Sequence, residues 1–141
     1  NNTLSRLIKT PKLYFYDTGL VCYLTKWSNP EVMMAGAMSG ALLENFAVTE
    51  ILKTYQNAGR EPHMYFYRDR EAREIDLLLE GDGSLFPLEI KKAASPDPRL
   101  ANVFRVIDKT PYKRGVGGIL CLAETLTALN KDCLVIPIGM I

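Results

Sequence analysis

The sequence predicts a mixed α/β domain: a sheet with parallel and antiparallel strands, flanked by helices, after an N-terminal helical lead-in. From residue 39 the expected order of elements is α-β-β-β-α-β, and this alternation favours a mixed sheet with helices packed on it. The segment Gly81-Asp82-Gly83 between two apolar runs is a strong hairpin signal. The 141 residues are 48% hydrophobic and 23% charged, a globular composition that excludes a disordered or collagen-like chain.

The first part of the chain is expected to be helical. We expect residues 1–38 to form a separate lead-in, in which Asp17 caps the start of a helix. Residues 39–141 are expected to form the main domain. Its first helix should run from about Ser39 to Ala58, where Gly59 ends it.

The strands and the second helix follow from runs of apolar residues and from turn residues. Asp97 as N-cap and Pro98 at the first helical position predict a helix that continues to about Lys109. Residues 124–129 are expected to form a short helix. Strands are expected at about 63–68, 73–80, 84–92, 116–122 and 133–137.

Side-chain alternation predicts the register of the central hairpin. A four-residue loop from Gly81 to Ser84 pairs Glu80 with Leu85, and this register places Asp76 opposite Glu89. Lys91 lies on the same side as these two carboxylates. The opposite side is expected to carry the apolar residues Ile75, Leu77, Leu79, Phe86, Leu88 and Ile90.

Two facing carboxylates repel each other, by up to about 1 kcal/mol at a surface. A divalent cation such as Mg²⁺ converts this repulsion into coordination, and an adjacent lysine stabilises negative charge on a phosphate. Glu44 adds a third carboxylate, on an apolar stripe of the first helix. The structural alternative pairs Glu74 with Lys91 across the hairpin and gives Asp76 and Glu89 arginine partners from residues 68–73.

The triplet Glu89-Ile90-Lys91, with Asp76 on the preceding strand and Glu44 on a helix upstream, resembles the PD-(D/E)xK nuclease superfamily. The resemblance implies a restriction-endonuclease-like fold. It also implies that Asp76 and Glu89 hold Mg²⁺ or Mn²⁺ with the Ile90 carbonyl, and that Lys91 positions the attacking water. Glu44 would hold a second metal or tune the first. The implied reaction is phosphodiester hydrolysis on DNA.

A closer resemblance spans nearly the whole chain. It is to an uncharacterised domain family at the C-terminus of bacterial and archaeal AAA+-type ATPases, and it implies an adjoining ATPase domain as partner. Because the chain opens on Asn1 rather than Met and has no P-loop, we expect a fragment without its own ATP site. The segments that carry the resemblance are 11–20, 43–46, 65–69, 74–76 and 88–91.

Charge and composition leave a second function open. The formal net charge is only +1, so an inactive nuclease-fold module that docks to DNA, to a protein or to the ATPase is the alternative. Lys92, Arg99 and Arg105 are candidates for nucleic-acid contacts, although such residues are also common on solvated faces. The aromatic runs 14–16 and 65–67 are expected in the core more than on bases.

No apolar run is long enough to span a membrane, and no signal peptide opens the chain. Cys22, Cys121 and Cys133 are far apart among apolar neighbours, which indicates buried thiols in a cytoplasmic protein. His63, the one histidine, excludes a histidine-based triad or zinc site and is expected near a strand start. The sequence makes no prediction of oligomeric state.

Overall fold

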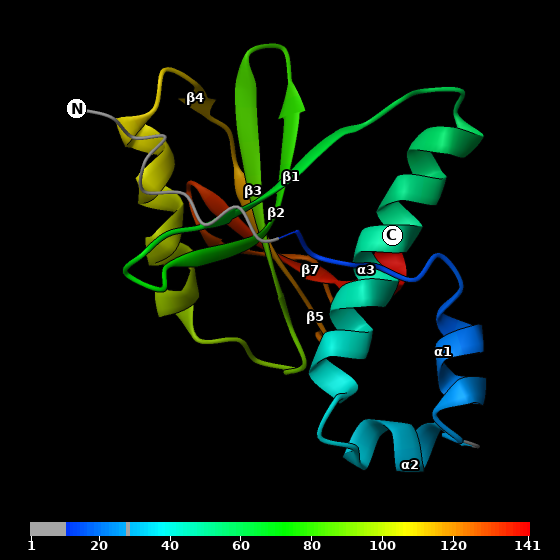
Figure 1. Cartoon of the computed structure of the whole chain (residues 1–141). Coiled ribbons are helices and arrows are strands. Elements are labelled where there is room, and N and C mark those ends of the chain that lie inside the picture. The colour runs from blue at the N-terminus through cyan, green and yellow to red at the C-terminus, as the bar shows by residue number, and fades with distance from the viewer. Residues whose placement is uncertain (1–10, 28) are drawn as a thin grey trace.

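A mixed seven-stranded sheet forms the centre of the molecule, with helices on both faces (Figure 1). The computed structural model describes residues 11–27 and 29–141. The strands run in the order β1-β2-β3-β5-β7-β6, and β4 pairs with β3 beside this path. They are β1 (His63–Arg68), β2 (Glu74–Gly81), β3 (Ser84–Lys91), β4 (Lys113–Arg114), β5 (Gly117–Cys121), β6 (Thr127–Asn130) and β7 (Cys133–Pro137). The predicted fold class is confirmed.

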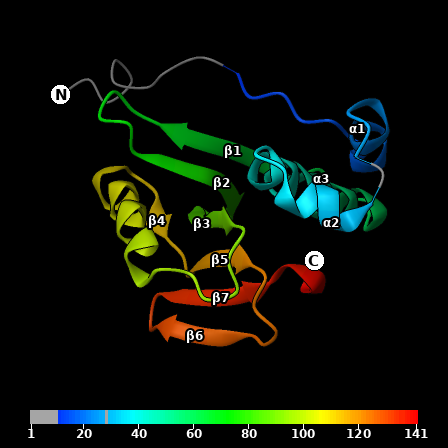
Figure 2. The same ribbon diagram turned by 90° about the horizontal axis from the view of Figure 1, so that it is seen from below.

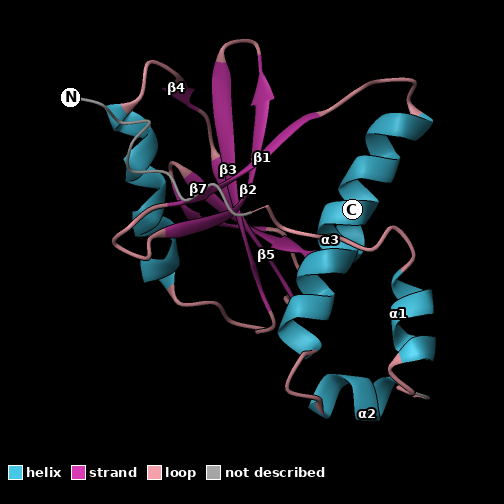
Figure 3. Cartoon of the chain, in the orientation of Figure 1, coloured by secondary structure: helices cyan, strands magenta, loops and turns pink. Residues whose placement is uncertain are grey.

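The helices fall into two layers, one on each side of the sheet (Figures 2 and 3). One side carries α1 (Thr18–Leu24), α2 (Pro30–Ala35) and the long α3 (Ser39–Asn57). The 3₁₀ helix η2 (Pro98–Lys109) covers the other side, and η3 (Ile138–Met140) ends the chain. As predicted, Asp17 caps α1, because its Oδ1 accepts the N–H of Leu20 at 3.0 Å.

The hairpin register predicted from alternation is confirmed, although its turn is shorter than expected. Glu80 pairs with Leu85, and the antiparallel pairing also includes Gly81 and Ser84. Only Asp82 and Gly83 are left in the turn, with φ values of 51° and 71°. Two successive left-handed residues are typical of the tight hairpin turns that match the twist of the strands.

A bulge in β2 changes which side chains share a face. Tyr65 of β1 pairs with Leu78, but Tyr67 pairs with Ile75. Two residues of β2, Asp76 and Leu77, therefore lie opposite a single residue of β1. Such a bulge reverses the alternation of the strand beyond it.

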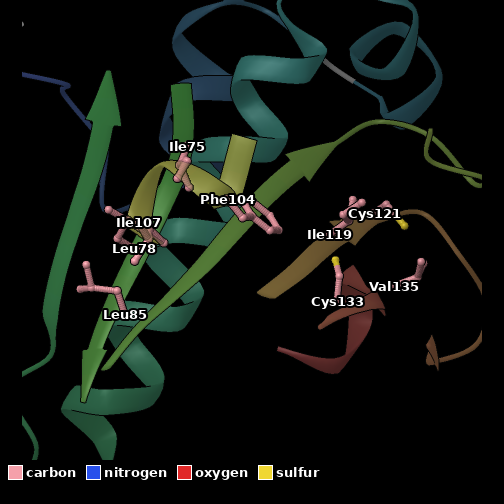
Figure 4. Packing of buried hydrophobic residues seen from close by; sticks show 9 residues of the cluster. All are labelled: Ile75, Leu78, Leu85, Phe104, Ile107, Ile119, Cys121, Cys133 and Val135. Carbon is pink, nitrogen blue, oxygen red and sulfur yellow. The ribbon is translucent and has the colours of Figure 1, made fainter. Parts of the chain in front are cut away.

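The bulge divides the apolar residues of β2 between two cores, so the prediction that Ile75 shares a face with Leu77 is wrong. Ile75 packs under η2 with Phe104 and Ile107, whereas Leu77 packs under α3 with Val48. Figure 4 shows the first core, whose buried members are Ile75, Leu78, Leu85, Phe104, Ile107, Ile119, Cys121, Cys133 and Val135.

Two further expectations from the sequence have definite outcomes. The helix expected at 124–129 is wrong: residues 127–130 form β6, which pairs antiparallel with β7. Cys121 and Cys133 are buried free thiols as predicted, whereas Cys22 is half-buried.

Among the helices of the described chain, none combines the length and hydrophobicity that a membrane crossing requires.

Candidate metal and phosphate site

The candidate site lies where β2 and β3 stop pairing. Their antiparallel pairing reaches Leu77 and Leu88, after which β3 continues alongside β5. At this point a side chain, not the backbone of β2, bonds to the backbone of β3: Oδ2 of Asp76 accepts the N–H of Ile90 at 2.9 Å. Asp76 and Glu89 are only 7% and 5% exposed. The bulge and the end of the hairpin together place two carboxylates inside the protein.

Lys91 joins the two carboxylates. Its Nζ lies 3.2 Å from Oδ2 of Asp76 and 2.9 Å from Oε2 of Glu89. The structure therefore brings together the three residues predicted to form the site. The alternative pairing of Glu74 with Lys91 is wrong, because Glu74 instead forms ion pairs with Lys12 and Arg68.

The site holds more negative than positive charge. Burial, and next the charge of Asp76, raise the pKa of Glu89 to about 7, against the opposing effect of Lys91. Burial disfavours the charged form of Lys91, but hydrogen bonds and charge from Glu89 and Asp76 outweigh it, and the pKa of Lys91 is raised. One ammonium group thus serves two buried carboxylates.

This donor set fits a hard divalent cation. Carboxylate and carbonyl oxygens are the ligands that Mg²⁺ and Mn²⁺ prefer, and a cation relieves the repulsion that raises the pKa of Glu89. Asp76 and Glu89 supply two such ligands. Within residues 11–27 and 29–141, no three His, Cys, Asp or Glu side chains are grouped so as to hold a metal ion.

Glu44 forms hydrogen bonds with the lead-in and does not join Asp76 and Glu89 in a metal-binding group. Its Oε1 accepts hydrogen bonds from Nζ of Lys12 at 3.0 Å and from the hydroxyl of Tyr14 at 2.9 Å. Lys12 also contacts Glu74 at 2.5 Å. Burial and then Glu44 raise the pKa of Tyr14, to which the charge of Asp76 also contributes. Glu44 therefore lies in an ionic network next to the site.

The basic residues expected to contact nucleic acid lie apart from one another. Lys92 donates hydrogen bonds to the carbonyl of Met34 and to Oγ of Ser39, and so ties the end of β3 to α2 and α3. Arg99 forms an exposed ion pair with Asp97 at 2.6 Å. Arg99 and Arg105 lie on η2, across the sheet from α3 (Figure 2). They do not form one basic surface with Lys92.

Three residues that build the surroundings of the site were not predicted to do so: Lys12 and Asn45 had no predicted role, and Tyr14 was expected only in the core. Asn45 is 7% exposed, and its side-chain amide forms two hydrogen bonds with the backbone of Phe15. A polar residue beside apolar ones in the middle of a helix was the available signal, since a buried amide needs partners.

A known family model matches most of the chain. The model described as "Domain of unknown function (DUF4143)" matches residues 39–141, from the first residue of α3 to the end of the chain. No curated protein and no solved structure matches the chain. By that match over most of its length, the chain belongs to the DUF4143 family, whose description assigns no function.

Proposed function

We propose that the protein is a metal-dependent nuclease that hydrolyses phosphodiester bonds in DNA, with Asp76, Glu89 and Lys91 as its site. The observation that carries the proposal is the contact of Lys91 with two buried carboxylates at the point where β2 and β3 separate. Two buried carboxylates that share one ammonium group destabilise the folded protein unless a bound ligand supplies further positive charge. A site of this kind is therefore better explained by function than by stability.

Each side chain has a role that follows from its place. Asp76, Glu89 and the carbonyl of Ile90 would hold Mg²⁺ or Mn²⁺, and the bound ion would supply Lewis acidity and lower the pKa of water. The N–H of Ile90 fixes the orientation of the Asp76 carboxylate. Lys91, with 37% of its side chain exposed, is open to solvent and can orient a water or stabilise a phosphate oxygen.

The first test is Mn²⁺ binding by calorimetry, with and without a DNA oligonucleotide, followed by cleavage of that DNA. We expect Asp76→Asn and Glu89→Gln to abolish binding, and Lys91→Met to slow cleavage by about 10²–10³-fold. Glu80→Gln is the matched control, because Glu80 lies on β2 at the other end of the strand. Cleavage that persists in Asp76→Asn would contradict the proposal.

The second candidate is an inactive nuclease-fold module that docks to DNA, to a protein or to an adjoining ATPase domain. It is favoured by the contacts that already engage each carboxylate, from Lys91 at Asp76 and Glu89 and from Lys12 at Glu44. This candidate predicts no Mn²⁺ binding with or without DNA, and partner affinity that Glu89→Gln leaves unchanged.

A further inference from the structure

A cleft of about 820 Å³ runs between α3 and β1, next to the candidate site. Val48 and Leu52 line it from α3, and Met64 and Phe66 from β1. Because of the bulge, Asp76 and Leu77 both reach its wall. Its volume is within the range of small-ligand sites. Whatever occupies this cleft lies against one of the two carboxylates.

Aromatic rings give the cleft its chemistry. Tyr14 and Tyr16 of the lead-in and Phe66 of β1 line it. Tyr16 is 56% exposed, so the expectation that the run 14–16 belongs to the core fails for this residue. Its hydroxyl donates to Oε1 of Gln56 at 3.1 Å, and Nζ of Lys53 lies 5.1 Å from its ring centroid. These contacts hold an exposed ring in a fixed orientation.

Cations accompany the rings. Lys12 Nζ lies 5.5 Å from the ring centroid of Phe66, and Lys53 lies over Tyr16. Arg60 lines the cleft and forms no ion pair with any of the described residues. Lys12 and Lys53 are already ion-paired with glutamates, which leaves Arg60 as the cation available to a ligand. Exposed aromatic faces beside a cation are a combination that binds single-stranded nucleic acid, through base stacking and phosphate contacts.

The charge of the chain distinguishes a single strand from a duplex. Proteins bind duplex DNA mainly by neutralising phosphates, and the net charge of +1 with dispersed basic residues supplies little of this. A duplex also keeps its bases stacked inside, where the cleft cannot reach them. An unpaired base gains additional affinity by stacking on an aromatic ring, a contribution that the stacked bases of a duplex cannot make.

We propose that this cleft binds an unpaired base of single-stranded DNA against Tyr16, and that it delivers the flanking phosphodiester to the carboxylates beside Asp76. The inference rests on the proposed nuclease function and names its substrate class. A strand that enters the cleft passes between Arg60 at one end and Lys12 near the other. Single strands, or duplexes with frayed ends, are therefore the substrates.

The test measures fluorescence anisotropy of labelled oligo(dT) of about 12 nucleotides, and of a duplex of the same length, with EDTA present to prevent cleavage. We expect the single strand to bind at least about 10-fold more tightly than the duplex. Tyr16→Leu should weaken single-strand binding by about 5- to 100-fold, and Tyr16→Phe should keep it. Tyr112→Leu, at a 42% exposed tyrosine after η2, is the matched control and should bind like the wild type.

Equal affinity for duplex and single strand, wild-type affinity of Tyr16→Leu, or no binding to either DNA would overturn the inference. Urea unfolding of each variant excludes misfolding as the cause of a loss. The two proposals fail in different ways. Cleavage of duplex that needs Asp76 but not Tyr16 refutes the cleft alone. Tyr16-dependent binding without metal-dependent cleavage refutes the nuclease alone.

Discussion

At the scale of single residues, two kinds of buried carboxylate occur in this fold. Asp69, 2% exposed, accepts hydrogen bonds from the Tyr67 hydroxyl, from the N–H groups of Glu71 and Arg73 and from the Arg73 guanidinium. Burial alone would raise the pKa of Asp69, but these bonds outweigh it and lower the pKa to about 2. The pKa of Glu89 moves the other way. Asp69 thus stabilises a turn, whereas Asp76 and Glu89 share the single ammonium group of Lys91.

Asp69→Ala should lower the free energy of unfolding by about 2–4 kcal/mol at pH 7, because it leaves the donors around a buried carboxylate without a partner. Asp108→Ala is the control. It removes an exposed ion pair with Arg114 and should cost less than about 1 kcal/mol. Urea unfolding measures both changes. Equal losses for the two variants would contradict this account.

The lowered pKa of Asp69 predicts how the stability of the protein depends on pH. Its pKa is lower in the folded than in the unfolded chain, so the stabilisation from Asp69 is present above about pH 4 and is lost as the pH falls toward 2. The difference in stability between wild type and Asp69→Ala should therefore shrink over that interval in urea titrations. A difference that stays constant down to pH 2 would show that the charge of Asp69 contributes nothing.

At the scale of elements, alternation predicted the hairpin register but not the bulge. The register of β2 and β3 follows from their own apolar residues, because a slip by one residue would expose one row. The bulge depends on β1, whose pairing with β2 shifts between Tyr65 and Tyr67. No local pattern in β2 encodes that shift. The sequence therefore predicted that Asp76 lies near Glu89, but not that it reaches the cleft.

The close packing of Phe104 against Gly117 of β5 predicts the effect of a substitution at this glycine. A Cβ on Gly117 would lie 2.7 Å from ring atoms of Phe104, which is 1% exposed and has little room to move. Gly117→Ala should therefore destabilise the protein by about 1–3 kcal/mol. The matched control is Gly40→Ala in α3, where a Cβ meets no atom within 4 Å. That change should be neutral or stabilising by up to about 1 kcal/mol. Thermal or urea unfolding separates the two, and similar values would contradict the packing argument.

At the scale of the whole molecule, two neighbouring residues of α3 make the part-buried hydrogen bonds to the lead-in, beside the exposed contacts of Tyr16 with Gln56 and Lys53. Glu44 binds Lys12 and Tyr14, and Asn45 binds the backbone of Phe15. These contacts bring segments 11–20 and 43–46 together in space. They also show why the role of Glu44 was hard to predict. Its partners lie about 30 positions away, and helical periodicity carries no information about them.

Asn45 is the residue that holds the lead-in most directly. Its Oδ1 accepts the N–H of Phe15 at 2.6 Å, and its Nδ2 donates to the carbonyl of Phe15 at 2.8 Å. Helix α1 contributes no buried residue of its own, and Nδ2 of Asn45 also donates to the hydroxyl of Thr18, its first residue, at 3.2 Å. Opening of the lead-in should therefore cost much less than unfolding of the sheet.

Asn45→Ala should increase amide hydrogen exchange across residues 15–24 by about 10-fold or more, since three hydrogen bonds of a buried amide are lost, two to the backbone of Phe15 and one to the Thr18 hydroxyl. Protection of β5, in the centre of the sheet, should change much less. Gln56→Ala is the control, because it removes only the exposed bond to Tyr16. If β5 loses protection as much as residues 15–24, the lead-in and the sheet unfold as one unit. If only the lead-in exchanges faster, it can leave α3 while the site at Asp76 stays folded, and the Tyr14–Tyr16 side of the cleft can open to admit a strand.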